Sequence, residues 1–250
     1  MEPENTVHTA EELQALRARF HSVKAALIQA CADAGRPADS VALLAAVKYA
    51  DAGEINFLHR ECGLCDIGEN RVQTFLAHYG ALEDKEHLRI HFIGTLQKNK
   101  VKYIVGKTDL IHSVDSAALA EEIDRQAAKQ GIVQKVLIEI NSGEEASKSG
   151  VSPAGAADLA QTVASLPHLQ LCGFMTMGPK YGDEAACFAN FSKTSQLALD
   201  IWSKKLHNIG IPLFSMGMTD SLSPAVRAGS GMVRVGRAIF GEKKTINEDK

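Results

Sequence analysis

Short apolar runs alternate with amphipathic segments along most of the chain. Residues 9–34 predict one amphipathic helix, and Thr9 and Glu12 have the spacing of a capping box at its start. Its apolar positions recur at helical spacing, at Leu13, Leu16, Phe20, Val23 and Leu27. The next segment, VALLAAV at 41–47, is a continuous apolar run typical of a strand that is buried on both faces. The chain therefore opens with a helix followed by a buried strand.

This alternation continues to the end of the chain. Strand-like runs lie near 41–47, 65–67, 90–93, 110–113, 135–140, 170–174, 212–215 and 232–235. Helical patterns lie between them, near 52–61, 69–79, 96–105, 116–130, 153–165, 183–208 and 219–228. Eight strands that alternate with helices typically form a parallel barrel of about 250 residues. We therefore predict an α/β fold, a single (β/α)8 TIM barrel with an extra N-terminal helix.

No linker, repeat or low-complexity tract divides the chain, so we expect one domain over residues 1–250. The polar stretches 1–8 and 242–250 are expected to be frayed tails. An open doubly wound sheet is the alternative architecture. The glycine-rich phosphate loop that should follow the first strand of such a sheet is missing from the sequence, which favours the barrel.

Composition and charge exclude several classes of protein. The 250 residues are 45% apolar and 23% charged, and 27 Lys and Arg against 30 Asp and Glu give a net charge of −3. This balance argues against a strongly basic nucleic-acid binder and against a disordered acidic chain. The apolar runs are shorter than the roughly 18 residues of a membrane span, and no secretory signal is visible. We therefore expect a cytoplasmic protein with neither nucleic acid nor membrane as a partner.

Functional groups in such a barrel lie at the carboxyl ends of the strands and in the loops that follow them. The site is therefore expected to draw on the residues at these positions. They are Lys48, Glu69, Asn70, Gly94, Gln97, His112, Ser113, Asn141, Met175, Thr176, residues 215–220 (SMGMTD), Arg234, Gly236 and Arg237.

Lys48 directly follows the first apolar strand, which predicts an amine at the mouth of an apolar cavity. Burial disfavours the charged form of an amine, and a neutral amine can form a Schiff base with an aldehyde or ketone. Lysines are also common at strand ends, where they extend into solvent. The position of Lys48 alone leaves both interpretations open.

The last two strands carry a second signal. Ser215, Gly217 and Thr219 lie where the seventh strand gives way to a helix, and the loops after strands 7 and 8 of such barrels often bind phosphate. An ordinary helix cap with a turn glycine explains the same residues equally well. Arg234 lies inside the apolar run MVRV, where an unpaired charge is costly, so we expect it to meet an acidic side chain or a ligand.

Other motifs give weaker signals. Cys62 and Cys65 have the spacing of half a zinc knuckle or of a redox pair, but no second pair accompanies them, and Cys65 is expected to begin a buried strand. The histidines form no metal-hydrolase motif, and the sequence contains no nucleophile elbow or P-loop. We therefore predict no metal site and a structural role for the two cysteines.

Seven stretches of sequence occur in a specific order. They are AAVK (45–48), IGENRVQ (67–73), HFIGTLQKNKVK (91–102), EASKSGV (145–151), GFMTM (173–177), SMGMTD (215–220) and GSGMVRVGRAIFG (229–241). Together they resemble the YggS/PROSC family of pyridoxal phosphate homeostasis proteins, from about residue 41 to Gly241. The resemblance implies a barrel like the N-terminal domain of alanine racemase, with pyridoxal 5′-phosphate (PLP) as cofactor at the carboxyl ends of the strands.

The resemblance also implies roles for individual residues. By matching position, Lys48 would carry the internal aldimine, and Asn70 would lie beside the cofactor ring. The phosphate would be held by Ser215 and Thr219, in the segment that contains Met216, together with the backbone around Gly236.

Two arginines of the last strand and its loop complete the implied site. Arg234 would face the pyridine nitrogen, and because an arginine cannot accept a hydrogen bond, that nitrogen would stay unprotonated. Such a cofactor is a weak electron sink and is poorly prepared for most carbanion chemistry. Arg237 stands where the family has Ser or Thr, and its guanidinium is able to bind an anion in place of the hydroxyl.

The function that the resemblance implies is a monomeric, non-enzymatic carrier that binds PLP and controls its free level. Indirect effects on amino-acid and keto-acid balance follow, with PLP-dependent apoenzymes as candidate partners. The alternative is a PLP-dependent amino-acid racemase with weak activity. Racemisation needs a base on each face of the substrate, and the tyrosine at a strand end, Tyr49, is expected to point away from Lys48. A lysine Schiff-base aldolase is a third alternative.

Overall fold

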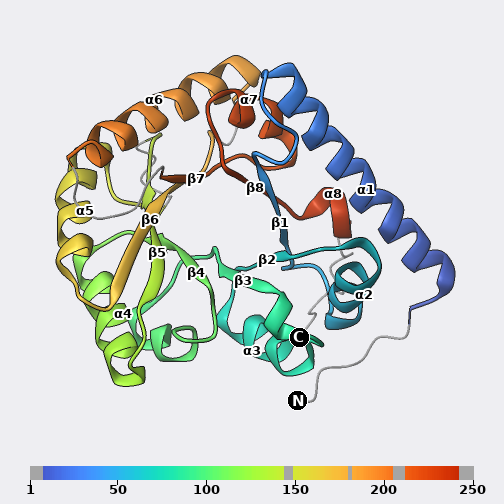
Figure 1. Cartoon of the computed structure of the whole chain (residues 1–250), viewed down its shortest axis with the longest axis horizontal. Helices are drawn as coiled ribbons and strands as arrows, with labels where there is room; N and C mark the ends of the chain where they lie inside the picture. Colours follow the sequence, from blue (N-terminus) through green and yellow to red (C-terminus); the bar gives the residue numbers. More distant parts are fainter. Residues whose placement is uncertain (1–7, 144–148, 180–181, 205–211, 242–250) are drawn as a thin grey trace, which may run out of the picture.

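Eight parallel strands close into a barrel, and each strand pairs with its neighbours in chain order (Figure 1). The computed structural model describes residues 8–143, 149–179, 182–204 and 212–241. The strands are β1 (Ala42–Ala46), β2 (Asp66–Glu69), β3 (Arg89–Phe92), β4 (Leu110–Val114), β5 (Gln134–Ile140), β6 (Leu169–Thr176), β7 (Leu213–Ser215) and β8 (Met232–Val235). Pairing of β8 with β1 closes the ring, which confirms the predicted barrel.

Helices surround the barrel (Figure 1). The α-helices are α1 (Ala10–Asp33), α2 (Ala52–Cys62), α3 (Val72–Ala81), α4 (Ala117–Gln130), α5 (Ala156–Ser165), α6 (Glu184–Trp202), α7 (Leu222–Arg227) and α8 (Arg237–Phe240). Four 3₁₀ helices join them: η1 (Lys85–His87), η2 (Lys98–Tyr103), η3 (Pro153–Gly155) and η4 (Thr219–Ser221). Within the described residues, no helix has both the length and the apolar character needed to cross a membrane.

The leading helix α1 forms as its sequence predicts. The Thr9 hydroxyl accepts a hydrogen bond from the Glu12 N–H at 3.2 Å, and the Glu12 carboxylate accepts one from the Thr9 N–H at 2.8 Å. This capping box satisfies two of the unpaired donors at the helix start. The helix packs against α2, α7 and α8 (Figure 1), and Arg19 Nε donates to the Ile239 carbonyl at 2.7 Å. The extra helix therefore covers the seam where β8 meets β1.

One predicted helix has a different geometry. The segment expected as an α-helix near 96–105 is the 3₁₀ helix η2. Val101 and Ile104 are fully buried and lie three residues apart, which is one turn of a 3₁₀ helix.

The predicted tails lie almost entirely outside the described residues. His8 is the exception, since its Nε2 lies 2.9 Å from Asp51 Oδ2. Asp51 and Glu54 form the capping box of α2, so the three side chains that converge here already stabilise a helix start. His8 belongs to the ordered chain rather than to the frayed tail that we expected to include it.

The inside of the barrel contains both apolar and polar side chains. Leu110, Leu137 and Met175 form an apolar cluster separate from the main core. Residues paired in register on parallel strands face the same side. Ser215 pairs with Met175, so its side chain points into the barrel with this cluster. A polar network also lies inside the barrel and leads to the candidate site.

Candidate functional site

Arg234, in β8, lies inside the barrel with its guanidinium buried. Nη1 donates to the Ser215 carbonyl at 2.6 Å and to Ser215 Oγ at 2.8 Å, and Nη2 donates to the Thr176 carbonyl at 3.0 Å. Burial lowers the pKa of Arg234 to about 10, although the charge of Glu139 opposes the shift, so the group stays cationic at neutral pH. These bonds use three of its five N–H groups. The other two N–H donors of the guanidinium have no acceptor among the described residues.

Glu139, in β5, is the acidic partner that the charge of Arg234 requires, although the two interact through space rather than by a direct bond. Its side chain is buried, and Ser149 Oγ donates to Oε1 at 2.7 Å. Burial raises the pKa of Glu139, while Ser149 and Arg234 oppose the rise. We did not predict this residue as part of the site. Its signal is an acidic side chain inside the apolar run LIEI.

A chain of hydrogen bonds crosses the barrel interior from Ser215. Ser215 Oγ lies 3.0 Å from His112 Nδ1, and His112 Nε2 lies 2.9 Å from His91 Nδ1. His91 Nε2 lies 3.1 Å from Asp66 Oδ1, and Arg89 donates to both oxygens of this carboxylate at 2.6 Å. Only Ser215 and His112 were predicted near the site. Asp66 and His91 were missed because the polar chain depends on contacts between four different strands.

The pH dependence of stability is expected to report on His112. Burial, with the charges of His91 and Arg234, holds the pKa of His112 well below its ordinary value of 6.5. The unfolded chain therefore takes up a proton at this residue where the folded chain does not, so stability is lost as the pH falls below about 6.5. We expect His112→Gln to flatten this loss by up to about 1.4 kcal/mol per pH unit. Urea unfolding at about pH 7.5 and about pH 5 measures the effect, and parallel losses in both proteins would contradict it.

Lys48 lies in the turn that follows β1, and its side chain is exposed. Its Nζ lies 4.4 Å from the centroid of the Tyr49 ring. This exposure agrees with the interpretation of Lys48 as a strand-end lysine that extends into solvent, whereas the prediction that Tyr49 points away from Lys48 is wrong. Side chains alternate only along a strand, and β1 ends at Ala46, before a turn in which Ala50 N donates to the Val47 carbonyl at 3.0 Å.

Asn70, directly after β2, carries an unsatisfied acceptor. Its Oδ1 is buried and has no hydrogen-bond partner among the described residues. A buried acceptor without a donor costs about 1–3 kcal/mol, so this oxygen suits a ligand that brings a donor. Gly94 makes close approach to the Asn70 backbone, since a Cβ at Gly94 would lie 2.0 Å from the Asn70 carbonyl oxygen. Glycine at position 94 therefore allows the loop after β3 to pack directly against the loop that carries Asn70.

Gly94→Ala is expected to destabilise the protein by about 1–3 kcal/mol, because the new methyl group meets backbone that cannot move aside easily. Gly80→Ala is the matched control: a Cβ at Gly80, in α3, meets nothing within 4 Å. Alanine there is expected to be neutral or to stabilise the protein by up to about 1 kcal/mol. Chemical denaturation of both variants tests the difference, and similar midpoints would contradict it.

The loops after β7 and β8, where we predicted phosphate binding, lie close together. Arg237 Nη2 lies 2.8 Å from Asp220 Oδ2, so an exposed ion pair joins the two loops. Thr219 is half-buried at the start of η4. At Gly236 a Cβ would lie 2.8 Å from the Ala46 carbonyl oxygen, which explains why this position has no side chain. The backbone at Gly236 therefore lies directly against the end of β1.

Some predicted groups have partners within the protein. Met216 N–H donates to the Met232 carbonyl at 3.1 Å, and the Met216 carbonyl accepts from Ser230 Oγ at 2.8 Å. Glu69 Oε1 lies 2.7 Å from His78 Nδ1, in α3. The Ser215 hydroxyl, predicted to bind phosphate, contacts Arg234 and His112.

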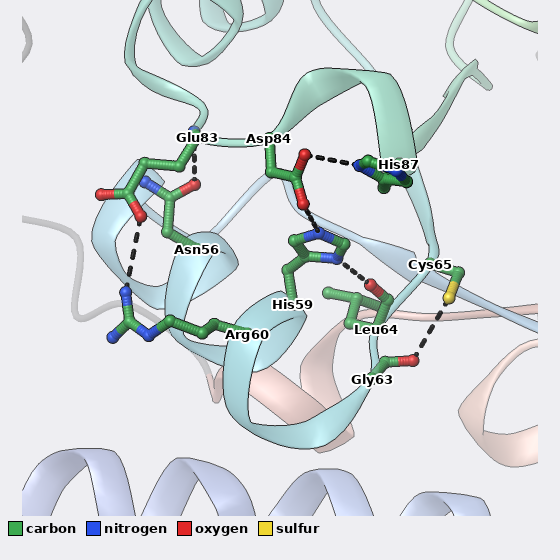
Figure 2. A network of polar contacts seen from close by, with 9 residues as sticks. All are labelled: Asn56, His59, Arg60, Gly63, Leu64, Cys65, Glu83, Asp84 and His87. Carbon is green, nitrogen blue, oxygen red and sulfur yellow. Dashed lines mark hydrogen bonds and ion pairs between the residues drawn. The ribbon is translucent and has the colours of Figure 1, made fainter.

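The two cysteines of the C-x-x-C motif lie at the other end of the barrel, where β2 begins. Figure 2 shows Cys65 Sγ donating to the Gly63 carbonyl at 3.4 Å. Cys65 is exposed and β2 starts at Asp66, so the prediction that Cys65 begins a buried strand is wrong. In the same view the nearby His59 is bonded to the Leu64 carbonyl and to Asp84. The motif therefore plays no part in the site at the carboxyl ends of the strands.

The sequence pattern described as "Alanine racemase, N-terminal domain" matches residues 5–244. A curated relative, the pyridoxal phosphate homeostasis protein of Aquifex aeolicus, is 40% identical over 226 residues, which are 90% of this chain and 97% of the relative. The match therefore extends over almost the full length of both proteins.

Solved structures give the same picture. PipY of Synechococcus elongatus, solved with PLP bound, is 30% identical to this chain and has a TM-score of 0.78, over 90% of this chain and 100% of PipY. An alanine racemase of Clostridium difficile has a TM-score of 0.72 at 15% identity, over 92% of this chain and 57% of the racemase. At that identity the racemase supports the fold alone.

Proposed function

This chain belongs to the pyridoxal phosphate homeostasis proteins, within the family of the alanine racemase N-terminal domain, and we propose that it binds PLP and controls its free level. The observation that carries the proposal is the buried cationic Arg234, whose guanidinium keeps two N–H donors beyond its bonds within the described chain. The pyridine nitrogen of PLP is an acceptor for such a donor. The unsatisfied Oδ1 of Asn70 gives independent support for a polar ligand.

Lys48 is the residue that we propose to hold PLP covalently. PLP supplies an aldehyde, and a primary amine condenses with it to a Schiff base with release of one water. Lys48 is exposed in the turn after β1, so incoming cofactor can reach its amine from solvent. The ring of Tyr49 covers one side of the ammonium group at 4.4 Å.

We propose that the phosphate lies between the loops after β7 and β8. Thr219 supplies a hydroxyl, and the backbone at Gly236 approaches from β8. Arg237 exchanges its exposed partner Asp220 for the phosphate, since exposed ion pairs are worth less than about 1 kcal/mol. Ser215 supports the site through Arg234 rather than through a direct bond to phosphate, because its hydroxyl already contacts Arg234 and His112.

A carrier fits these residues better than an enzyme does. Arg234 would donate to the ring nitrogen and, unlike an acid, would not transfer its proton to it, so the bound cofactor would be a weak electron sink. Racemisation needs bases on opposite faces of the substrate. The ring of Tyr49 lies against Lys48, so these two residues approach from one side. We therefore expect at most weak racemase turnover.

We propose that the protein acts as a monomer in the cytoplasm, with PLP-dependent apoenzymes as candidate partners. All five cysteines are free, which suits a reducing compartment.

Titration of the purified protein with PLP, followed by borohydride reduction and peptide mass mapping, tests the proposal. We expect a yellow band that reduction bleaches and a stable adduct on the peptide that contains Lys48. A protein that stays colourless and carries no adduct would overturn it. A lysine adduct formed only with keto substrates, and not with PLP, would favour the aldolase alternative.

A further inference from the structure

The chain of hydrogen-bonded polar side chains lies in an unusual place, the inside of the barrel. Barrel interiors of this type are usually filled by bulky branched side chains. Here His91 and His112 are buried together, with Asp66 buried at one end of the chain and Arg234 buried at the other. Burying this much polarity is costly unless every donor meets an acceptor. The direction of each hydrogen bond is therefore fixed by the groups at its ends.

The anionic end determines the tautomer of both histidines. Asp66 accepts two hydrogen bonds from Arg89. Burial alone would raise the pKa of Asp66, but its contacts with His91 and Arg89 outweigh burial and lower this pKa. Asp66 is therefore an ionised acceptor. His91 therefore donates from Nε2, and Nδ1 of a ring that carries one proton is then an acceptor. His112 Nε2 donates to that atom, and His112 Nδ1 becomes an acceptor in turn.

The same logic fixes the hydroxyl of Ser215. Because His112 Nδ1 accepts, Ser215 Oγ–H must donate to it, and the lone pairs of Oγ are left for Arg234. Nη1 of Arg234 is thus held by two acceptors of one residue, the carbonyl and the hydroxyl of Ser215. Without an acceptor at position 112, no partner fixes the direction of the hydroxyl proton, and the lone pairs of Oγ are no longer held toward the guanidinium.

We propose that His112 is a positioning residue for the cofactor: by accepting the Ser215 proton, it fixes Ser215 Oγ as an acceptor for Arg234 and holds the guanidinium toward the ring nitrogen of PLP. This inference rests on the proposed function, since it gives Arg234 its ligand. Asp66 and His91 serve to keep His112 in the accepting tautomer. His112 itself does not touch PLP.

Two substitutions at His112 separate positioning from packing. His112→Phe keeps a ring but removes the acceptor, whereas His112→Gln keeps an acceptor and a donor on a smaller side chain. Thr194→Val is the matched control, because Thr194 is buried in α6 and its hydroxyl donates to the Asn190 carbonyl of the same helix at 2.9 Å. The readouts are the dissociation rate of PLP and the absorption band of the bound cofactor against pH.

We expect His112→Phe to release PLP about tenfold faster, equivalent to the loss of one hydrogen bond, and to shift the pH dependence of the band. His112→Gln should recover most of the wild-type rate, and Thr194→Val should match wild type. In the protein without cofactor, ¹H–¹⁵N spectra should show His112 protonated on Nε2 alone. Where His112→Phe does not fold, Ser215→Ala breaks the same link and should loosen PLP equally.

The outcomes distinguish this inference from the proposed function. Wild-type protein that binds no PLP overturns both. Wild-type protein that binds PLP, with an unchanged rate and band in His112→Phe, overturns the role of His112 only. Equal loosening in His112→Phe and His112→Gln would show that packing matters rather than the acceptor, and a proton on His112 Nδ1 would reverse the chain; either result overturns the inference.

Discussion

Lys48→Ala is expected to abolish the yellow form of the protein and to leave no adduct after borohydride reduction. Only a primary amine can form the proposed bond, and alanine removes it without changing the strand that precedes it. Because Lys48 is exposed and lies beyond the end of β1, the substitution should change the free energy of unfolding by less than about 0.5 kcal/mol. We expect the affinity for PLP to fall at least about a hundredfold, or about 2.7 kcal/mol. Absorption spectra and equilibrium dialysis measure the two effects.

Lys107→Ala is the matched control for this experiment. Lys107 is also exposed and also has its Nζ over an aromatic ring, 5.8 Å from the centroid of Tyr79. It precedes β4 and so lies at the opposite end of the barrel from the proposed site. The Lys107 variant should keep the colour and the adduct. A Lys48 variant that stays as yellow as the Lys107 variant would show that another lysine holds the cofactor.

The fold could be predicted from the sequence because its signals are local. Most strands contain a short apolar run with a helical pattern beside it, and the spacing of Thr9 and Glu12 was sufficient to place the start of α1. The 3₁₀ geometry of η2 was not predictable in this way. The spacing of the buried Val101, in η2, and Ile104, which directly follows η2, fits either helix type, and packing against the barrel decides between them.

The candidate site was predictable only in part. Sequence position marked Arg234 as a buried charge, and the structure confirms that it is buried with specific partners. Those partners come from β6 and β7, which only closure of the barrel brings next to β8. The contact of Lys48 with Tyr49 was missed for a different reason: a turn begins one residue before Lys48, and strand alternation no longer applies there.

Arg234→Met is expected to be the most destabilising single change in the site, at about 3–5 kcal/mol. Methionine has a similar length, but it leaves Glu139 without its cation and the Ser215 and Thr176 carbonyls without their donor. Loss of the cation also removes one of the effects that keep the pKa of Glu139 from rising further. Since a raised folded pKa costs stability as the pH rises through it, the variant should be weakened more at about pH 7.5 than at about pH 5.

The background Glu139→Gln shows whether charge is the cause. Glutamine keeps an oxygen for the bond from Ser149 Oγ but carries no charge to be left unpaired. Arg234→Met should therefore cost about 1–3 kcal/mol less in this background than in wild type, a coupling typical of interacting buried residues. Urea unfolding of the four cofactor-free proteins completes the double-mutant cycle. Additive costs would contradict the electrostatic role of Glu139 and would mean that Arg234 stabilises the protein through its three hydrogen bonds alone. Coupling would mean that the charge of Glu139 allows the Arg234 cation to stay buried where PLP is proposed to bind.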